Sequence, residues 1–530
     1  MSVTSFGFLI FALVTTALYF LLPQKWQWAV LLCAGLFFYV VCCGTGIVYV
    51  IITASSVYAA SYGLDVLSFR QKLYLKDNKE SLSGEEKTDY KRGMQQKRKR
   101  ILVLALVLNF GLLCIFKYSH FAINGLNRGL FLFSFQQVNN GFSLIMPLGM
   151  SFYTFQSTGY LIDVYWGNIR AERNFFKTLL FVSFFPQMVQ GPISSFEELS
   201  CTLYRAHVFS SENLRCGSRR MLWGYFKKLV IADMLAPWVS TLFTDYASCC
   251  GISVFLGMFM YSIQIYADFS GYMDIVCGFS EILGIRLREN FERPYFSRSV
   301  AEYWRRWHIS LGDWFKKYLY YPLAVSLAAK KMGKWGQRHL GKTFGRTIPA
   351  TFALILVWFT TGLWHGAGWS YIVWGGVNGF FIIATMWLDP VYDKIKQALH
   401  IRSEALYWRL FQIIRTFILI TFIKVLPEVG TLKEGLKLWK QIFACRVVPG
   451  SFGELLPWVT DKLSFLVIVF GTALMLCYDL VSCRCPVRDY LDKKPLLLRY
   501  ALTFILIAFI LVCGCYGMDY DARDFMYFKF

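Results

Sequence analysis

The sequence predicts an all-α polytopic membrane protein, and its composition and hydropathy are the main reasons. Of its 530 residues 56% are hydrophobic and 17% charged, and the mean hydropathy is +0.44. A soluble protein of this length would be about 45–50% apolar and about 25% charged. We expect one integral membrane domain over residues 1–530, with about eleven or more tilted transmembrane and re-entrant helices, because several uncharged stretches approach the ~20 residues needed to cross a bilayer.

The candidate spans follow one another along the whole chain. In order they are 5–22, 26–43, 46–62, 101–117, 141–162, 175–193, 221–240, 251–267, 269–285, 350–368, 370–388, 410–427, 462–482 and 499–515. The stretches around 141–193 and 251–285 also fit re-entrant or tilted helices, which is why we expect about eleven or more helices rather than a fixed count.

The net charge of +22 is unevenly distributed, and this asymmetry predicts the orientation. Lys and Arg gather at 70–100, 286–317, 330–346 and 484–499. By the positive-inside rule these segments face the cytoplasm. Segment 68–100 is then a basic cytoplasmic loop, and both termini, including the tail 516–530, lie outside. Membrane topology accounts for the basic charge, so we expect no nucleic-acid partner.

The apolar segment 351–386 contains one histidine, His365. An ionisable side chain within such a run is costly, and by default it marks a functional site. Histidine is also the side chain suited to proton transfer near neutral pH. The alternative is a structural histidine that hydrogen-bonds a neighbouring helix.

Segment 299–323 is too charged to span and predicts an amphipathic helix in the membrane interface. Its apolar stripe at helical spacing comprises Trp304, Trp307, His308, Leu311, Phe315, Tyr318 and Leu319. His308 lies on this stripe, so we expect it to point into the protein. The cations off the stripe are Arg305, Arg306, Lys316 and Lys317. Two interpretations remain open for them: contact with lipid phosphates, or binding of an anionic cytosolic donor such as coenzyme A.

Carboxylates and cysteines contribute less to the functional prediction. Asp163, Asp268, Asp274 and Glu281 lie in apolar surroundings, where we favour structural hydrogen-bond partners over tunnel-lining groups. The fifteen cysteines show no zinc-type spacing, so no resident metal is expected.

Four blocks carry a resemblance to a known family. They are PLGMSFYTFQSTGYLIDVYWG (147–167), FFPQMVQGPI (184–193), ADFSGYMDI with LRENFERPYFSRSVAEYWRRWHISLGDWFKKYLYYPL (267–323), and GLWHGAGWSYIVWGGVNG (362–379). In this order they resemble the membrane-bound O-acyltransferase (MBOAT) family, in its bacterial branch of alginate O-acetylation proteins and teichoic acid D-alanyl transferases. The combination of WRRWHxSL with LWHGA makes the resemblance specific.

The resemblance implies an enzyme, an acyltransferase of the bacterial cytoplasmic membrane, with a ring of helices around a central tunnel. His365 matches the family's catalytic histidine and His308 its second polar position. The implied reaction moves acetyl from cytosolic acetyl-CoA, a substrate rather than a bound cofactor, toward an extracellular or cell-wall polysaccharide. The terminal residues Phe525, Tyr527, Phe528 and Phe530 resemble an aromatic motif that docks an extracytoplasmic partner similar to SGNH hydrolases.

Three alternatives stay open at the level of the sequence. Within the family, the runner-up is D-alanyl transfer from a carrier-protein thioester to teichoic acid. Outside it, a transporter would use helix-breaking glycines and buried polar residues, although we find no inverted repeat. A scaffold would need the terminal aromatic residues but not His365.

Overall fold

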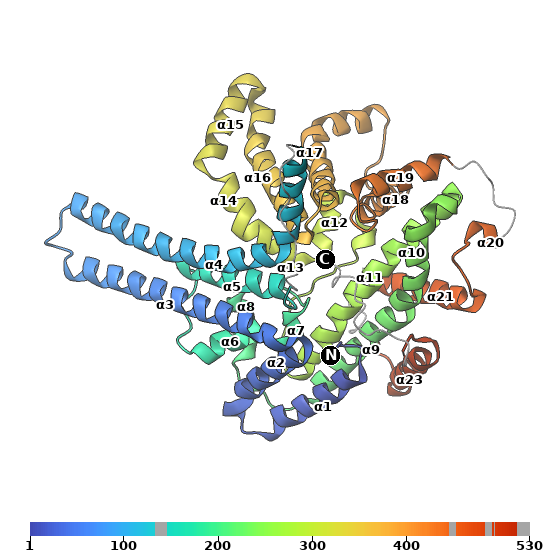
Figure 1. Cartoon of the computed structure of the whole chain (residues 1–530), viewed down its shortest axis with the longest axis horizontal. Helices are drawn as coiled ribbons and strands as arrows, with labels where there is room; N and C mark the ends of the chain where they lie inside the picture. Colours follow the sequence, from blue (N-terminus) through green and yellow to red (C-terminus); the bar gives the residue numbers. More distant parts are fainter. Residues whose placement is uncertain (133–145, 445–451, 483–489, 492, 517–530) are drawn as a thin grey trace. The chain divides into compact units, whose positions relative to one another are not determined.

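The computed structural model describes residues 1–132, 146–444, 452–482, 490–491 and 493–516, and these ranges are folded almost entirely into helices (Figure 1). Within them, one isolated β-bridge joins Phe291 and Trp307. The all-α class is therefore confirmed. The chain divides into two compact units, of which the first contains residues 1–214 and 279–288 and the second residues 215–278 and 289–530.

Eight helical segments in the described ranges are long and apolar enough to cross a membrane. They are Gln24–Asp77, Gly84–Asn127, Gly251–Ile282, Gly341–His365, Trp369–Ala398, Leu406–Lys424, Lys462–Val481 and Leu496–Cys513. Together they confirm a polytopic membrane protein. The figure of about eleven or more helices, and their arrangement around a tunnel, stay predictions.

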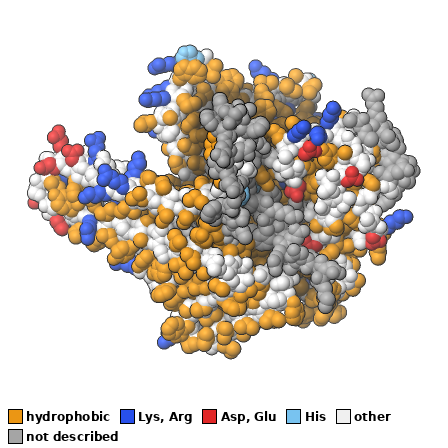
Figure 2. Space-filling model, in the orientation of Figure 1, with side chains coloured by type: hydrophobic (Ala, Val, Ile, Leu, Met, Phe, Trp, Pro, Cys, Tyr) orange, Lys and Arg blue, Asp and Glu red, His pale blue; other side chains and the backbone are white. Residues whose placement is uncertain are grey.

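The first unit contains a long helical hairpin in a segment that was expected to be a loop. The unit begins with α1 (Phe6–Leu21) and α2 (Gln27–Cys43), and the hairpin follows as α3 (Ile47–Asp77) and α4 (Gly84–Leu132). The expected loop 68–100 is wrong in extent, because α3 and α4 cover all of it except residues 78–83, and the two helices lie side by side (Figure 1). Lys, Arg, Glu and Gln favour helices, and Ser83 and Glu86 cap α4 reciprocally: each side chain accepts from the other's backbone N–H, at 3.2 and 2.8 Å. Figure 2 shows the charged side chains over this hairpin, while hydrophobic ones cover most of the rest of the visible face.

The remaining helices of the first unit are shorter. They are α5 (Met150–Trp166), α6 (Phe175–Ser183), α7 (Phe185–Met188) and α8 (Phe196–Leu203). The expected span 175–193 is not one helix. Pro186 lacks a backbone N–H and cannot continue α6, so the chain turns at Phe184 and starts again as α7.

The second unit contains most of the membrane-crossing helices. Its first part comprises α9 (Ser211–Tyr225), a π-helix (Phe226–Ala232), α10 (Asp233–Asp245), α11 (Gly251–Ile282), α12 (Val300–Arg306), α13 (Ile309–Phe315), a second π-helix (Lys316–Tyr320) and α14 (Tyr321–Ala324). Its second part comprises α15 (Leu327–His339), α16 (Gly341–His365), α17 (Trp369–Ala398), α18 (Leu406–Lys424), α19 (Leu432–Ala444), α20 (Phe452–Leu455), α21 (Lys462–Val481) and α23 (Leu496–Cys513). A few residues at the start of α9 and the end of α11 belong to the first unit.

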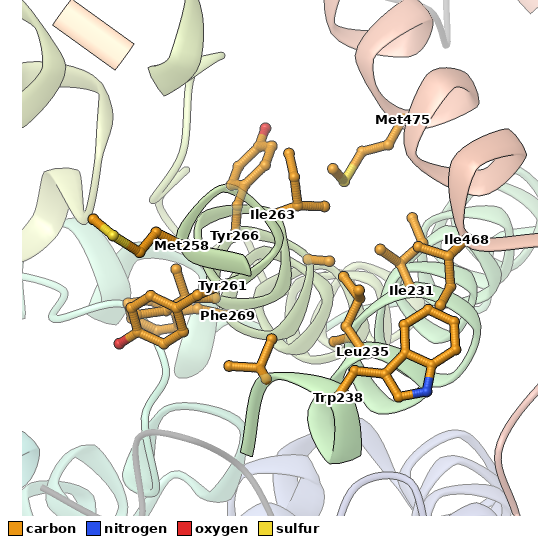
Figure 3. Close-up of a cluster of buried hydrophobic side chains, with 14 of the residues drawn as sticks. Ile231, Leu235, Trp238, Met258, Tyr261, Ile263, Tyr266, Phe269, Ile468 and Met475 are labelled. Atoms are coloured by element: carbon orange, nitrogen blue, oxygen red, sulfur yellow. The ribbon is translucent and has the colours of Figure 1, made fainter. Parts of the chain in front are cut away.

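Helix α11 corrects the expectation of two spans at 251–267 and 269–285. It is one continuous helix of 32 residues. Glycines bring it against α9: a Cβ on Gly224 would lie 2.6 Å from the Gly271 carbonyl oxygen, and one on Gly278 would lie 2.5 Å from that of Gly217. Small residues at such a contact let two membrane helices approach closely. On other sides, α11 packs with α10 and α21 around Tyr261, Tyr266 and Trp238 (Figure 3).

Buried ion pairs also tie α11 to the π-helix before α10. Lys227 Nζ lies 2.6 Å from Asp274, and Lys228 Nζ lies 2.6 Å from Asp268 and 2.7 Å from Asp233. Arg220 adds a second cation 3.0 Å from Asp274. The structural role expected for Asp268 and Asp274 is confirmed, since buried carboxylates require such partners.

Candidate active site

His308 lies between α12 and α13, at a break that the sequence analysis did not anticipate. The expected continuous helix over 299–323 is wrong, because His308 has a left-handed backbone with φ of +49°. The break has a tertiary cause. The N–H of Ile309 donates to the Asn290 carbonyl (3.0 Å), and the N–H of Glu292 donates to the Arg306 carbonyl (2.9 Å), so a neighbouring segment pairs with the chain here.

The expected direction of the His308 side chain is nevertheless confirmed. The residue is 2% exposed, and Trp307, Leu311 and Phe315 of the predicted stripe are buried with it. Its ring meets Phe269 edge-on, with centroids 4.9 Å apart. The apolar stripe thus survives the break, because each short helix keeps its own buried face.

Asn290 determines the tautomer of His308. Its Oδ1 accepts the backbone N–H of Ser310 (3.0 Å) and lies 3.3 Å from His308 Nδ1. Its Nδ2 points to Met273 Sδ (3.5 Å), which fixes the orientation of the amide. An amide oxygen only accepts, so Nδ1 carries the proton and Nε2 keeps its lone pair. Asn290 was missed in the sequence because its role depends on this tertiary pairing.

The pKa of His308 leads to a test of its burial. Burial lowers the pKa of this imidazole from 6.5 to about 3, so the ring is neutral at physiological pH. The unfolded chain takes up a proton below pH 6.5 and the folded chain does not. His308 should therefore lower the free energy of unfolding by about 1.4 kcal/mol per pH unit as the pH falls from 6.5 to about 3. Unfolding of wild type and His308→Gln in detergent at pH 7.5, 6.0 and 5.0 measures this contribution as the difference between their two slopes; equal slopes in both proteins would contradict the burial.

His365 is the last residue of α16. Its ring lies 4.7 Å from the Trp364 ring and 4.7 Å from the Trp374 ring of α17, measured between centroids. Trp364 also contacts His308, with centroids 6.1 Å apart. His365 is 9% exposed. The second unit therefore brings both predicted histidines into contact with the same indole, in aromatic and largely dry surroundings.

Glycines allow α16 to pack closely against α17 within the turn of α16 that precedes His365. A Cβ on Gly362 would lie 2.6 Å from the Tyr371 carbonyl oxygen, and one on Gly375 would lie 2.4 Å from the Trp358 carbonyl oxygen. The position of His365 thus depends on a contact between two backbones, which only glycine permits.

Neighbouring Gly375 and Gly376 offer a matched pair for testing this contact. A Cβ on Gly376 would meet nothing within 4 Å. We expect Gly375→Ala to lower the unfolding midpoint, because overpacking costs about 1–3 kcal/mol. Gly376→Ala should raise it slightly, since alanine is the better helix former by about 1 kcal/mol. Thermal unfolding of the purified variants measures both; a midpoint for Gly375→Ala at or above that of Gly376→Ala would contradict the contact.

Asn378 of α17 joins α12 to the same region. Its Oδ1 accepts from Trp304 Nε1 (2.9 Å), and its Nδ2 donates to the Trp374 carbonyl (2.9 Å). Asn378 is fully buried. The sequence analysis missed it, although an amide within the apolar run 369–386 is the kind of signal that identified His365.

The four predicted donor-binding cations have different surroundings. Arg305 and Lys316 are exposed, and among the described residues neither forms an ion pair. Arg306 pairs with Glu302 at 2.7 Å, and Lys317 lies 5.0 Å from the centroid of the Tyr318 ring. The predicted docking residues Phe525, Tyr527, Phe528 and Phe530 lie outside the described residues.

Comparison with known proteins matches the part of the chain that contains these residues. Residues 169–425 match the model of the membrane-bound O-acyltransferase family. The chain is 33% identical over 346 residues to "probable alginate O-acetylase AlgI" of Pseudomonas aeruginosa, covering 65% of this chain and 60% of that protein. It is 33% identical over 304 residues to the peptidoglycan O-acetyltransferase of Helicobacter pylori (52% and 54%), and 28% identical over 259 residues to the teichoic acid D-alanyltransferase of Streptococcus thermophilus (47% and 60%).

The helical fold and the two buried imidazoles thus belong to a polytopic membrane protein with similarity to acyl-transferring proteins. The chain carries a membrane-bound O-acyltransferase domain at residues 169–425, which contains both His308 and His365. It spans about 54–60% of the length of the curated relatives described above.

Proposed function

We propose that this protein is an O-acetyltransferase that takes acetyl from cytosolic acetyl-CoA and delivers it across the membrane toward hydroxyls of an extracellular or cell-wall polysaccharide. The observation that carries the proposal is the placement of His308 and His365, both buried and both in contact with Trp364, inside the matched domain. The names of the relatives favour acetyl: two acetylating proteins are 33% identical, against 28% for a D-alanyl transferase.

In the proposed reaction His365 acts as a general base. It takes the proton of the attacking hydroxyl as the oxygen adds to the thioester carbonyl carbon. The carbon–sulfur bond then breaks, and the sulfur leaves with the proton returned by the imidazolium, giving an ester and a free thiol. The Nδ1–H tautomer of His308 leaves Nε2 as an acceptor, which supports a role in orienting the hydroxyl rather than in donating to the oxyanion. Transfer through an acyl-histidine is the alternative route, and trapping of labelled acyl-enzyme distinguishes the two.

The exposed cations fit a binding role for the donor phosphates. Arg305 and Lys316 are available for charge-assisted hydrogen bonds to a coenzyme A phosphate. Arg306 is partly compensated by Glu302, so we assign it a weaker contact. Lys317 completes the set. Exchange of all four residues should raise the KM for the donor more than it lowers kcat.

The remaining parts of the proposal concern the two sides of the membrane. The protein is placed in the bacterial cytoplasmic membrane with both termini outside, following the distribution of Lys and Arg. An extracytoplasmic partner similar to SGNH hydrolases is proposed to complete transfer to the polymer, docking on Phe525, Tyr527, Phe528 and Phe530.

The test is base-labile O-acetyl ester on the extracellular polymers of the native host. Wild type and His365→Ala are compared at matched membrane levels, with deletion of 525–530 as a third strain. Loss of ester in His365→Ala supports the proposal, and the depleted polymer identifies the acceptor. Unchanged ester contradicts it. Loss only on deletion of 525–530 indicates a scaffold, ester-linked D-alanine lost in place of acetate indicates D-alanyl transfer, and solute flux coupled to an ion gradient indicates a transporter.

A further inference from the structure

Lys424, the last residue of α18, places its side-chain amino group inside a buried cluster of aromatic rings. Its Nζ lies 3.8 Å from the centroid of the Trp307 ring, 4.8 Å from that of Tyr295 and 5.3 Å from that of Tyr303. The residue is 7% exposed. The negative faces of aromatic rings attract a cation at such distances, more strongly where water is excluded.

The hydrogen bonds of Lys424 do not supply a counter-charge. Its Nζ donates to Tyr295 Oη (2.9 Å), and that hydroxyl donates to the Ser262 carbonyl. Among the described residues, no carboxylate oxygen forms an ion pair with Lys424. A buried amino group with aromatic rings in place of a carboxylate is costly for stability. An apolar side chain would fill this position at lower cost, so the presence of a lysine here is not explained by packing alone.

Trp307 connects this cluster to the candidate active site, because the next residue is His308. Its indole stacks on Tyr303 (5.6 Å between centroids, 22° between planes) and meets Phe291 edge-on at 5.0 Å. Lys424 lies over the same indole. The rings of Tyr266, Phe269 and Tyr295 complete the cage around Trp307, and Lys424 is its one contact that is not an aromatic ring among the described residues.

The backbone of His308 is what requires this support. A non-glycine residue with positive φ is strained and persists only where its surroundings determine it. Asn290 holds His308 from one direction, through its ring and the following backbone. From the other direction, the chain is held by Trp307, the residue directly before His308. Loosening either anchor would let the backbone relax toward an ordinary helix, which would redirect the imidazole.

We propose that Lys424 is a positioning residue: by holding the Trp307 ring, it fixes the strained backbone of His308 and the direction of its imidazole. Its effect on acyl transfer rests on the function proposed above. The placement of His308 itself does not depend on that function. The two are therefore tested by separate measurements.

The first measurement is the rate of acyl transfer. Lys424→Met removes the nitrogen at similar volume, whereas Lys424→Arg keeps N–H groups against the rings. We expect kcat to fall about 10- to 100-fold in Lys424→Met with KM little changed, because small displacements of a reacting group are costly in rate. Lys424→Arg should stay close to wild type. The control is Lys440→Met, at an exposed position of α19, which should have no effect. Wild-type kcat in Lys424→Met, or equal losses in the Met and Arg variants, would overturn the proposal.

The second measurement needs no activity. The contribution of buried His308 to the pH dependence of the free energy of unfolding is the difference in slope between wild type and His308→Gln below pH 6.5. If Lys424 holds His308 in place, this difference should be smaller when both proteins also carry Lys424→Met, because a displaced imidazole takes up its proton at a more ordinary pH. An equal difference in the two backgrounds would contradict the proposal even if the protein proved to be no acyltransferase. A smaller difference without any acyl transfer in wild type would instead reject the proposed function alone.

Discussion

His365→Ala is expected to reduce the rate of ester formation by about 100- to 10,000-fold, the range that a positioned general base contributes. The imidazole is the proton acceptor in the proposed step, and its neighbours Trp364 and Trp374 offer no substitute base. The fold should tolerate the change, since the Gly362 and Gly375 contacts that join α16 to α17 do not involve the ring. The measurement is the initial rate of ester-linked acetate formation in membranes with equal amounts of protein.

The matched control is His339→Ala. His339 ends α15 on the exposed surface, where its ring stacks on Trp335. It should leave the rate unchanged, so a general effect of removing a histidine is separated from the effect at the site. A His365→Ala variant that keeps more than a tenth of the wild-type rate at a normal unfolding midpoint would exclude the general-base role.

The class of fold and the burial of the two histidines could be predicted because the sequence signals for both are local. A charge-poor apolar run predicts a membrane helix at any position. His365 is conspicuous because it interrupts such a run, and His308 because it lies on an apolar stripe. Both side chains proved buried as that pattern predicts.

What could not be predicted depends on contacts between distant segments. The break at His308 requires pairing of Trp307 with Phe291, and the hydrogen bonds of Asn290 exist only after that pairing. The interruption at Asp268 suggested the end of a span, whereas Lys228 from an earlier helix neutralises it and lets α11 continue. The helices of segment 68–100, by contrast, could have been predicted. Its Lys, Arg and Glu residues favour helix, and the spacing of Ser83 and Glu86 is that of a capping box.

The largest effect on stability is expected from Lys228→Met. The substitution removes the cation shared by Asp268 and Asp233, two carboxylates whose side chains are 2% and 9% exposed. Removing one partner of a buried ion pair costs about 3–5 kcal/mol, because it leaves an uncompensated buried charge. Such a loss is comparable to the total stability of many domains, so we expect little folded protein in the membrane.

Burial rather than the ion-pair distance should account for this loss, and a second pair in the same unit tests that point. Lys396 lies 2.6 Å from Asp393, the same distance as Lys228 from Asp268, but these side chains are 27% and 58% exposed. Lys396→Met should therefore cost at most about 1 kcal/mol. Adding Asp268→Leu to Lys228→Met should recover part of the stability, since an apolar pair needs no counter-charge. Unfolding midpoints in detergent compare the three variants, and equal losses for Lys228→Met and Lys396→Met would mean that water reaches Asp268 and that α11 is held by its glycine contacts instead.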